Sequence, residues 1–206
     1  MTAVGARLVA AAADTIRTHA DELTSLDRAI GDGDHGINLR RGFDAVADQS
    51  DELDAMPLGG ALEKAGMTLV MKVGGASGPL YGSLLMSMGK TLGDSPVTVA
   101  TLAEAFASGV EKVKARGRSD AGAKTMLDVL VPVRESLAAN VDRPVPEILA
   151  TVQEVADTSL EATRDMIATK GRASFLGPRS RGHLDPGARS SVLLIRAVCA
   201  VVGESE

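Results

Sequence analysis

The stretch VGARLVAAAADTIRTHADEL, residues 4–23, indicates how this chain of 206 residues is built. Its apolar face recurs every three or four positions, at Leu8, Ala12, Ile16, His19 and Leu23. This spacing is typical of one face of an amphipathic helix, which we expect to end near residue 25. Charged residues interrupt the segment, so it resembles neither a signal peptide nor a membrane span. The chain therefore opens with a helix that must bury one face against other elements.

The same periodicity returns along the rest of the chain. Two further helices are expected from residue 39 and, opened by Pro57, at 57–73, and another at 77–92. A fifth helix should run from a capping box of Thr101 and Glu104 to Lys114, and a sixth should cover 124–139 with a bend at Pro132. The last two are expected from Pro146 to Thr169 and at 190–202. Strict two-residue alternation is too short anywhere to found a sheet, and no linker composition divides the chain. We predict an all-α fold, one domain over 1–206, built as an antiparallel bundle of about eight helices.

The composition is that of a globular protein, with 45% hydrophobic and 24% charged residues. Aromatic residues make up only 2%, so the core must consist of Ala, Leu, Val and Met, which favours helices. A net charge of −5 argues against a nucleic-acid partner. The single cysteine, Cys199, excludes an internal disulfide and suits a reducing compartment. We therefore expect a cytoplasmic protein without a membrane partner.

The motif GDGDHG, residues 31–36, matches the G-x-G-x-x-G pattern of a dinucleotide-binding loop. That loop requires a preceding strand, whereas a helix precedes this one. An EF-hand counted from Asp32 would need Glu at its twelfth position, which is Phe43. The GKT at 89–91 lacks the upstream glycine of a P-loop. All three interpretations fail.

What remains at this motif is a cluster of three acids within eight residues, Asp27, Asp32 and Asp34. Each of them alone is equally typical of a helix cap or turn. Together, in a glycine-rich loop, they favour a site for Mg²⁺ or Ca²⁺, which prefer carboxylate oxygens. Such a loop can face a phosphate if divalent cations lie between the two.

The segment VGGASGPLYG, residues 73–82, is a second candidate site. Its glycines permit close approach to the backbone, and Ser77 stands at a helix start, where free N–H groups attract anions. A tight turn with Ser77 as a plain cap explains the segment equally well. His35 could shuttle protons or merely pack, and no role is preferred for His183.

Four irregular segments, 24–38, 73–79, 116–125 and 170–190, could meet at one end of an antiparallel bundle. The last is long for a loop and rich in arginine, and Asp185 is its one acid. Arg172 and its neighbours could add positive charge for a phosphate, although a solvated basic loop is the more usual explanation.

Four motifs in order resemble the nucleotide-binding L subunits of dihydroxyacetone kinase. They are LDRAIGDGDHGINLRRGF (26–43), GMTLVMKVGGASGPLYG (66–82), KTMLDVLVPV (124–133) and KGRASFLGPRSRGHLDPGARSS (170–191). The resemblance covers nearly the whole chain. It implies an antiparallel bundle of eight helices with a nucleotide at one end.

The resemblance also implies the site residues. Asp27, Asp32 and Asp34 would hold two Mg²⁺ ions that bridge to the phosphates of ADP or ATP. The nucleotide would be lined by His35, Gly36, Ile37, Asn38, Ala76, Ser77, Gly117, Met126, Arg172, Asp185, Pro186 and Gly187. No residue is identified as a general base, so the catalytic role stays unassigned. The resemblance implies Asp at the position of Ala123, so this chain departs from the family's pattern in that loop.

Within this family, some members are ATP-using kinases that fuse the domain to a dihydroxyacetone-binding domain and often have Cys at the position of His35. In others the L subunit is separate and keeps ADP as a coenzyme. A phosphohistidine carrier, the M subunit, recharges that ADP, and the phosphate passes to dihydroxyacetone on a K subunit. A separate chain with GDGDHG resembles the second group. An ATP-dependent subunit for another small ketose and a nucleotide-dependent regulator remain alternatives, and self-association into a homodimer remains open.

Overall fold

The computed structural model describes residues 2–204, with side chains from residue 5, and in this part of the chain all regular structure is helical. The α-helices are α1 (Thr2–Ile30), α2 (His35–Ala47), α3 (Ser50–Asp54), α4 (Leu58–Lys72), α5 (Ser77–Leu92), α6 (Val99–Gly117), α7 (Leu127–Ala139), α8 (Val145–Ala162) and α9 (Pro186–Gly203). Two 3₁₀ helices, η1 (Thr163–Asp165) and η2 (Arg172–Ser180), lie between α8 and α9. The predicted all-α class is confirmed.

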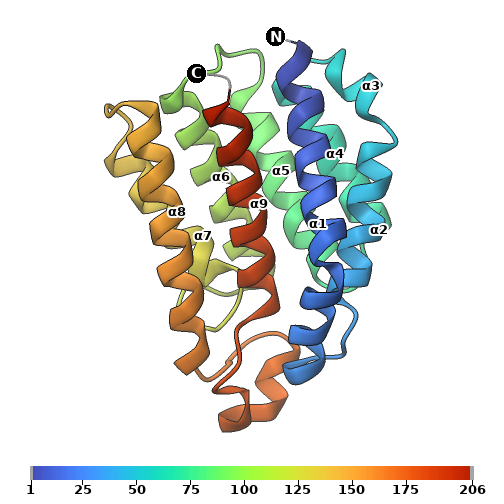
Figure 1. The fold of residues 1–206 in the computed structure, drawn as a ribbon, viewed down its shortest axis with the longest axis vertical. Helices are drawn as coiled ribbons and strands as arrows, with labels where there is room; N and C mark the ends of the chain where they lie inside the picture. Colours follow the sequence, from blue (N-terminus) through green and yellow to red (C-terminus); the bar gives the residue numbers. More distant parts are fainter. Residues whose placement is uncertain (1, 205–206) are drawn as a thin grey trace.

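The eight long helices form a closed ring. Each packs on the next along the chain, with α2 packing directly on α4, and α9 closes the ring by packing on α1 (Figure 1). The largest apolar cluster draws on α1, α2, α4, α5, α6, α7 and α9, and a second cluster fills the space among α7, α8 and α9. Phe106 and Ile195 pack against both clusters, so the interior is continuous. As the low aromatic content predicted, aliphatic side chains make up nearly all of this core.

Glycines set the close approach of α4 and α5. A Cβ on Gly66 would lie 2.7 Å from the Gly82 carbonyl oxygen, and a Cβ on Gly89 would lie 2.4 Å from the Gly59 carbonyl oxygen. Real Cβ atoms do not approach backbone oxygens so closely, so larger residues would push the helices apart. The tight pair matters for the site because α5 begins at Ser77.

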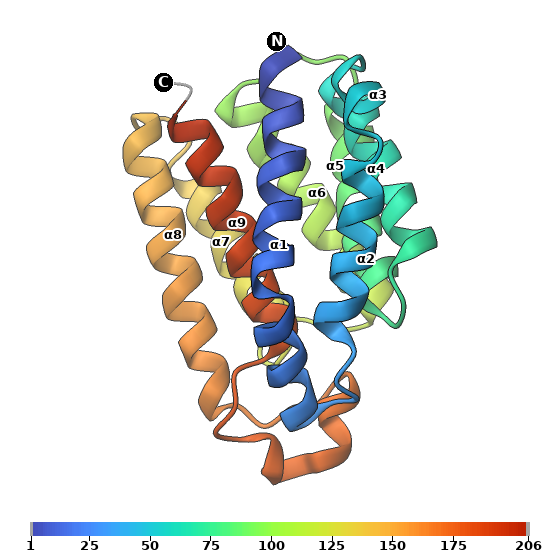
Figure 2. The same ribbon diagram turned by 45° about the vertical axis from the view of Figure 1, so that its right-hand side comes forward.

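Alternation of helix direction decides which connections share an end of the ring. The links 31–34, 73–76, 118–126 and 163–185 lie at one end, and both chain termini lie at the other (Figure 2). The expectation that the four irregular segments meet at one end is therefore confirmed. The segment 163–185 lies beyond the last turn of α1, where Ala168, Ala173 and Leu176 pack against Ile30.

Several helix boundaries differ from the sequence-based expectation. Helix α1 continues past residue 25 to Ile30, because Ile30 extends the buried stripe, and Asp27 consequently lies on a helix instead of in a loop. Helix α2 begins at His35 instead of residue 39, and α9 begins at Pro186 instead of residue 190. Helix α7 starts at Leu127, since Lys124 has a positive φ of 60° that no helix accepts.

Two further expectations about helix ends were wrong. The capping box joins Thr98 to Thr101, not Thr101 to Glu104, so α6 starts at Val99. Helix α8 begins at Val145, just before Pro146, and ends at Ala162, well short of Thr169, because the chain turns into η1 there.

One described helix, α9, has the length and apolar composition to cross a membrane. In this structure it packs between α1 and α8 as part of the ring. Its apolar character is accounted for by the residues that it contributes to the core.

Candidate functional site

Three carboxylates gather where α1 passes into α2. Oxygen atoms of Asp27, Asp32 and Asp34 all lie within 4.8 Å of one another. Asp27 is only 7% exposed, and its Oδ2 accepts the backbone N–H groups of Asp34 (2.9 Å) and His35 (3.1 Å). These two bonds satisfy one oxygen of a buried acid and fix the turn that carries the other two acids. The carboxylates of Asp32 and Asp34 are exposed, so the cluster opens to solvent.

The N-terminus of α5 lies beside this cluster, and His35 joins the two. His35 Nδ1 lies 3.0 Å from Ser77 Oγ, and His35 Nε2 lies 2.9 Å from Ser190 Oγ on α9. Ala76 occupies the N-cap position of α5 without a capping side chain, and Gly75 has a φ of 65° and open space around it. Free N–H groups at such a helix start favour an anion. Burial lowers the pKa of His35 to about 4, so the ring is neutral near pH 7.

The first turn of α9 forms another wall. Asp185 is the N-cap, and its Oδ2 accepts the Ala188 N–H at 2.7 Å, while its own N–H donates to Thr163 Oγ1 at 3.1 Å. Burial raises the pKa of Asp185 to about 7, and the nearby charge of Asp128 adds to the rise.

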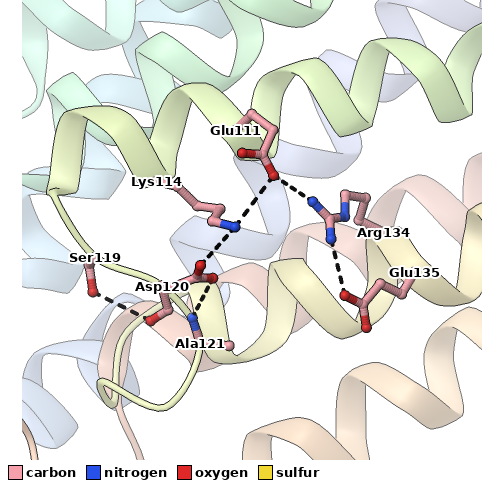
Figure 3. Close-up of polar contacts among 7 residues, drawn as sticks. All are labelled: Glu111, Lys114, Ser119, Asp120, Ala121, Arg134 and Glu135. Atoms are coloured by element: carbon pink, nitrogen blue, oxygen red, sulfur yellow. Dashed lines mark hydrogen bonds and ion pairs between the residues drawn. The ribbon is translucent and has the colours of Figure 1, made fainter.

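Two sets of contacts hold the loop 118–126 between α6 and α7: hydrogen bonds to a buried carboxylate and ion pairs on the surface. On the inside, Asp128 accepts the backbone N–H groups of Gly122 (2.5 Å) and Thr125 (2.6 Å). On the outside, Lys114 pairs with Asp120 at 2.8 Å, and the Asp120 carboxylate also accepts the Ala121 N–H at 2.8 Å (Figure 3). The same group of ion pairs continues through Glu111 and Arg134 to Glu135, which couples α6 to α7 beside the loop.

Segment 163–185 lies at the end of the ring beside loop 118–126 and the last turn of α1. Arg172 lies at the start of η2, and its Nε pairs with Asp32 Oδ2 at 3.1 Å. The Arg172 side chain is 71% exposed, so this contact is a weak surface pair. The guanidinium thus stands directly at the carboxylate cluster, where it can meet an anion that arrives there.

Residues 29–200 match the family model described as the DAK2 domain. The chain belongs to the DAK2 domain family. A PEP-dependent dihydroxyacetone kinase ADP-binding subunit of Listeria innocua is 44% identical over 176 residues, which are 85% of this chain and 84% of that subunit. The Escherichia coli ADP-binding subunit is 40% identical over 194 residues, 93% and 92% of the two chains. The resemblance to L subunits is confirmed.

Solved structures agree with the DAK2 domain assignment. The dihydroxyacetone kinase of C. freundii in complex with AMP-PNP and Mg²⁺ superposes with a TM-score of 0.76 at 26% identity. The native form of that kinase gives 0.77 at 25% identity. Either comparison covers 99% of this chain and 34% of the kinase, so this DAK2 domain spans about a third of the length of that protein.

The DAK2 domain brings most of the predicted site residues to one end of the ring. His35, Gly36 and Asn38 lie buried in the first turn of α2, and a Cβ on Gly74 would lie 2.9 Å from the Asn38 Oδ1. The remaining predicted residues occupy the ends of α5, α6, α7 and α9: Ala76, Ser77, Gly117, Met126, Asp185, Pro186 and Gly187. Ile37 differs from its neighbours, because its side chain is exposed and lines a groove beside Arg40 and Lys72.

Lys124 is a residue of this end that the sequence reasoning missed. Its side chain is 1% exposed, and its Nζ donates to the carbonyl oxygens of Thr163 (2.8 Å), Met166 (3.3 Å) and His183 (2.7 Å). One ammonium group therefore ties loop 118–126 to segment 163–185. The available signal was a lysine followed by the start of an apolar helix, which is no distinctive pattern.

Ala123 is the position at which the resemblance to the L subunits implies Asp. Its side chain is buried, and its carbonyl oxygen accepts the Thr169 N–H at 3.1 Å. The backbone thus holds this part of the loop against segment 163–185 without an acid at position 123.

Proposed function

We propose that this chain is the phosphoryl-transfer subunit of a dihydroxyacetone kinase and that it holds ADP or ATP with Mg²⁺ at the four-loop end of the ring. The observation that carries this proposal is the position of Asp27, Asp32 and Asp34 beside the free N-terminus of α5, linked through His35. The ADP-binding subunits of two bacteria, which match over most of their own length, support it.

The donor set fits Mg²⁺. Three carboxylates offer hard oxygen ligands, and Asp27 keeps its Oδ2 in place through two backbone N–H bonds. Two Mg²⁺ ions bound there would more than offset the three acids and would neutralise charge on the phosphates. Such ions would explain why an acidic loop lies beside a helix start whose free N–H groups favour an anion.

The chain's own residues would act by binding and orientation. The N–H groups at the start of α5 and Arg172 would bind phosphate oxygens, and the buried first turns of α2 and α9 would wall the nucleotide. The residues proposed to line it are His35, Gly36, Ile37, Asn38, Ala76, Ser77, Gly117, Met126, Arg172, Asp185, Pro186 and Gly187. No covalent intermediate on this chain is required, because phosphoryl transfer relies on positioning and charge neutralisation.

The candidate functions differ in the donor of the phosphate and in the sugar that accepts it. We propose that a phosphohistidine carrier recharges the bound ADP in the cytoplasm and that a K subunit presents dihydroxyacetone. A D-erythrulose kinase of Mycolicibacterium smegmatis is 34% identical, but this chain covers only 36% of that protein. An ATP-dependent subunit for another ketose is therefore the second choice. It would exchange free ATP rapidly, whereas a coenzyme-type subunit would purify with ADP and release it slowly.

The metal and nucleotide site is tested by calorimetric titration of ADP with and without Mg²⁺. We expect Asp34→Asn to abolish Mg²⁺-dependent ADP binding, because the cluster loses a charged ligand while the helices keep their contacts. Asp21→Asn is the matched control, since Asp21 is an exposed acid on the same helix as Asp27 and outside the cluster. Unchanged Mg·ADP affinity in Asp34→Asn, with an intact circular dichroism spectrum, would contradict the proposal.

The transfer itself is tested by reconstitution with dihydroxyacetone, a K subunit and a phosphohistidine carrier. Formation of dihydroxyacetone phosphate that depends on this chain is the expected result. Tight Mg·ADP binding without any transfer would instead favour a nucleotide-dependent regulator.

A further inference from the structure

Lys124 is buried at the end of the ring that carries the candidate site, and no step of the proposed function uses it. Its Nζ donates to the carbonyl oxygens of Thr163 (2.8 Å), His183 (2.7 Å) and Met166 (3.3 Å). The direction of these bonds is fixed, because an ammonium group has three N–H donors and no acceptor, whereas a carbonyl oxygen can only accept. A buried charge is costly unless it is hydrogen-bonded, so the ammonium group and the three carbonyl groups hold one another in place.

The backbone of Lys124 is a second sign that its surroundings constrain it. Its φ is 60°, in the left-handed region that residues other than glycine occupy at a cost in free energy. Such a conformation persists only where the neighbouring structure holds it, and here the side-chain bonds of Lys124 do so. The loop 118–126 is therefore anchored at Lys124 to a distant part of the chain.

The carbonyl groups that Lys124 holds frame Asp185, the N-cap of α9. Thr163 accepts from Lys124 through its carbonyl oxygen, and its Oγ1 accepts the Asp185 N–H at 3.1 Å. The carbonyl group of His183, which also accepts from Lys124, lies two residues before Asp185. One ammonium group therefore restrains both the chain that leads into Asp185 and the residue that accepts its N–H.

The same loop also touches the first turn of α9 directly. Met126 lies two residues after Lys124, and a Cβ on Gly187 would lie 3.4 Å from the Met126 backbone nitrogen. Met126, Asp185 and Gly187 are among the residues proposed to line the nucleotide. Lys124 thus joins the two segments, 118–126 and 183–187, that carry this part of the proposed wall.

We propose that Lys124 is a positioning residue that holds turn 183–187 against Met126 before the nucleotide binds. The inference deepens the proposed function and rests on it for the ligand. A wall that is already in place needs no ordering when the nucleotide arrives. A wall that must first assemble lowers the observed affinity by the fraction of molecules in which it is formed. Lys124 acts without touching the nucleotide, since its three donors are engaged by carbonyl groups.

Lys124→Met tests this role, because methionine keeps the apolar stem and has no donor. In calorimetric titrations we expect Mg·ADP affinity to fall about 10- to 100-fold, as when the fraction of molecules with an assembled wall drops to between about 1 and 10%. Lys114→Met is the matched control, since Lys114 pairs on the surface with Asp120 of the same loop and with Glu111. Exposed pairs contribute little, so its affinity should stay within about 2-fold. Unchanged affinity in Lys124→Met, or an equal loss in Lys114→Met, would overturn the proposal.

Hydrogen–deuterium exchange separates positioning from a general loss of stability. In free Lys124→Met protein we expect faster exchange at 118–126 and 183–187, and unchanged exchange at the links 93–98 and 140–144 at the other end of the ring. Saturating Mg·ADP should remove the difference from the unaltered protein, because the bound nucleotide selects the assembled wall. Equally faster exchange at both ends would mean that Lys124 only stabilises the fold.

Thr163→Val is a milder variant that keeps the test decisive if Lys124→Met does not fold. It removes the hydroxyl that accepts the Asp185 N–H and leaves the carbonyl bond to Lys124. We expect Mg·ADP affinity to fall about 2- to 10-fold, the worth of one hydrogen bond. The loss should disappear in a Lys124→Met background, where the turn is already released. Unchanged affinity in Thr163→Val, or additive losses in the double variant, would contradict the role of Lys124.

Failure of this inference and failure of the proposed function give different results. Absence of any Mg·ADP binding in the unaltered protein would refute the proposed function. Exchange in the free protein needs no ligand, so it would still show whether Lys124 holds turn 183–187. Normal Mg·ADP binding in the unaltered protein and in Lys124→Met alike would refute the positioning role alone.

Discussion

Asp27 illustrates how a single residue organises the site. A buried carboxylate is costly unless it is hydrogen-bonded, and Asp27 finds its donors seven and eight residues later in the N–H groups of Asp34 and His35. Those bonds fold the chain back over the end of α1 and bring the other two acids next to the first. The buried carboxylate of Asp27 thus stabilises the turn on which Asp32 and Asp34 are exposed.

Asp185 should give the protein a measurable dependence of stability on pH. Burial raises its pKa to about 7, whereas the unfolded chain titrates near 4. Between these values the native state binds more protons than the unfolded state, so the contribution to the unfolding free energy falls as the pH rises from about 4 to 7. Asp185→Asn keeps a capping side chain but cannot lose a proton. In urea denaturation, we therefore expect the stability of the unaltered protein relative to this variant to decline across that window.

The contrast between the two proteins isolates Asp185 from the other acids. Glu22, whose pKa is lowered chiefly by its bond to Arg189, acts in the opposite direction but is present in both. Parallel stability curves from pH 4 to 7 would show that Asp185 keeps an ordinary pKa.

At the scale of elements, the α4–α5 pair depends on glycines spaced seven residues apart on each helix. Gly59 and Gly66 on α4 meet Gly89 and Gly82 on α5 in antiparallel order. This repeat stands in the sequence and could have predicted the pair, because small residues two turns apart share one helix face. Close packing on α4 fixes the position of α5, and therefore the position of its N-terminus at the candidate site.

Gly89→Ala should destabilise the fold without touching the site. Its new Cβ would lie 2.4 Å from the Gly59 carbonyl oxygen, a backbone atom that cannot move aside alone. We expect a loss of about 1–3 kcal/mol in the free energy of unfolding, measured with urea. Gly60→Ala is the control, because its nearest neighbour lies 4.0 Å away, and there alanine should stabilise the helix by about 0.5–1 kcal/mol. Equal stability of the two variants would contradict close packing of α4 on α5.

Helix boundaries could be predicted only where the buried positions are apolar and the exposed positions are polar. Apolar periodicity located the long helices, since each must bury one face in the core. It failed at the end of α1, where Asp27 occupies the buried face and made the helix look finished. It failed at Lys124 as well, because the three carbonyl groups that hold this lysine come from residues 39, 42 and 59 positions later. Partners so distant in sequence leave no local pattern.

At the scale of the whole molecule, the direction of the chain assembles the site. Eight long helices that alternate in direction leave four connections at the end opposite the termini. Each of the four contains or adjoins a motif on which the resemblance to L subunits was based, so the sequence predicted which segments would meet at one end. The ring brings residues that are far apart in the sequence into contact. Arg172 pairs with Asp32, and His35 contacts both Ser77 and Ser190. Within residues 2–204, all of the candidate site residues that the fold brings together lie at the end of the ring opposite the termini.

Because the candidate site lies at one end of the ring, we predict that nucleotide changes hydrogen–deuterium exchange at that end and not at the other. We expect Mg·ADP to slow exchange at 31–34, 73–76, 118–126 and 163–185, because a ligand bound among these links opposes their local opening. At a concentration 100 times the dissociation constant, binding stabilises the native state by about 2.7 kcal/mol. The links 93–98 and 140–144 at the other end should keep their exchange rates, since they open without disturbing the site. ADP without Mg²⁺, and Mg·ADP with Asp34→Asn, should leave all of these rates unchanged. Equal slowing of the links at both ends would mean that the nucleotide does not bind where the four loops meet.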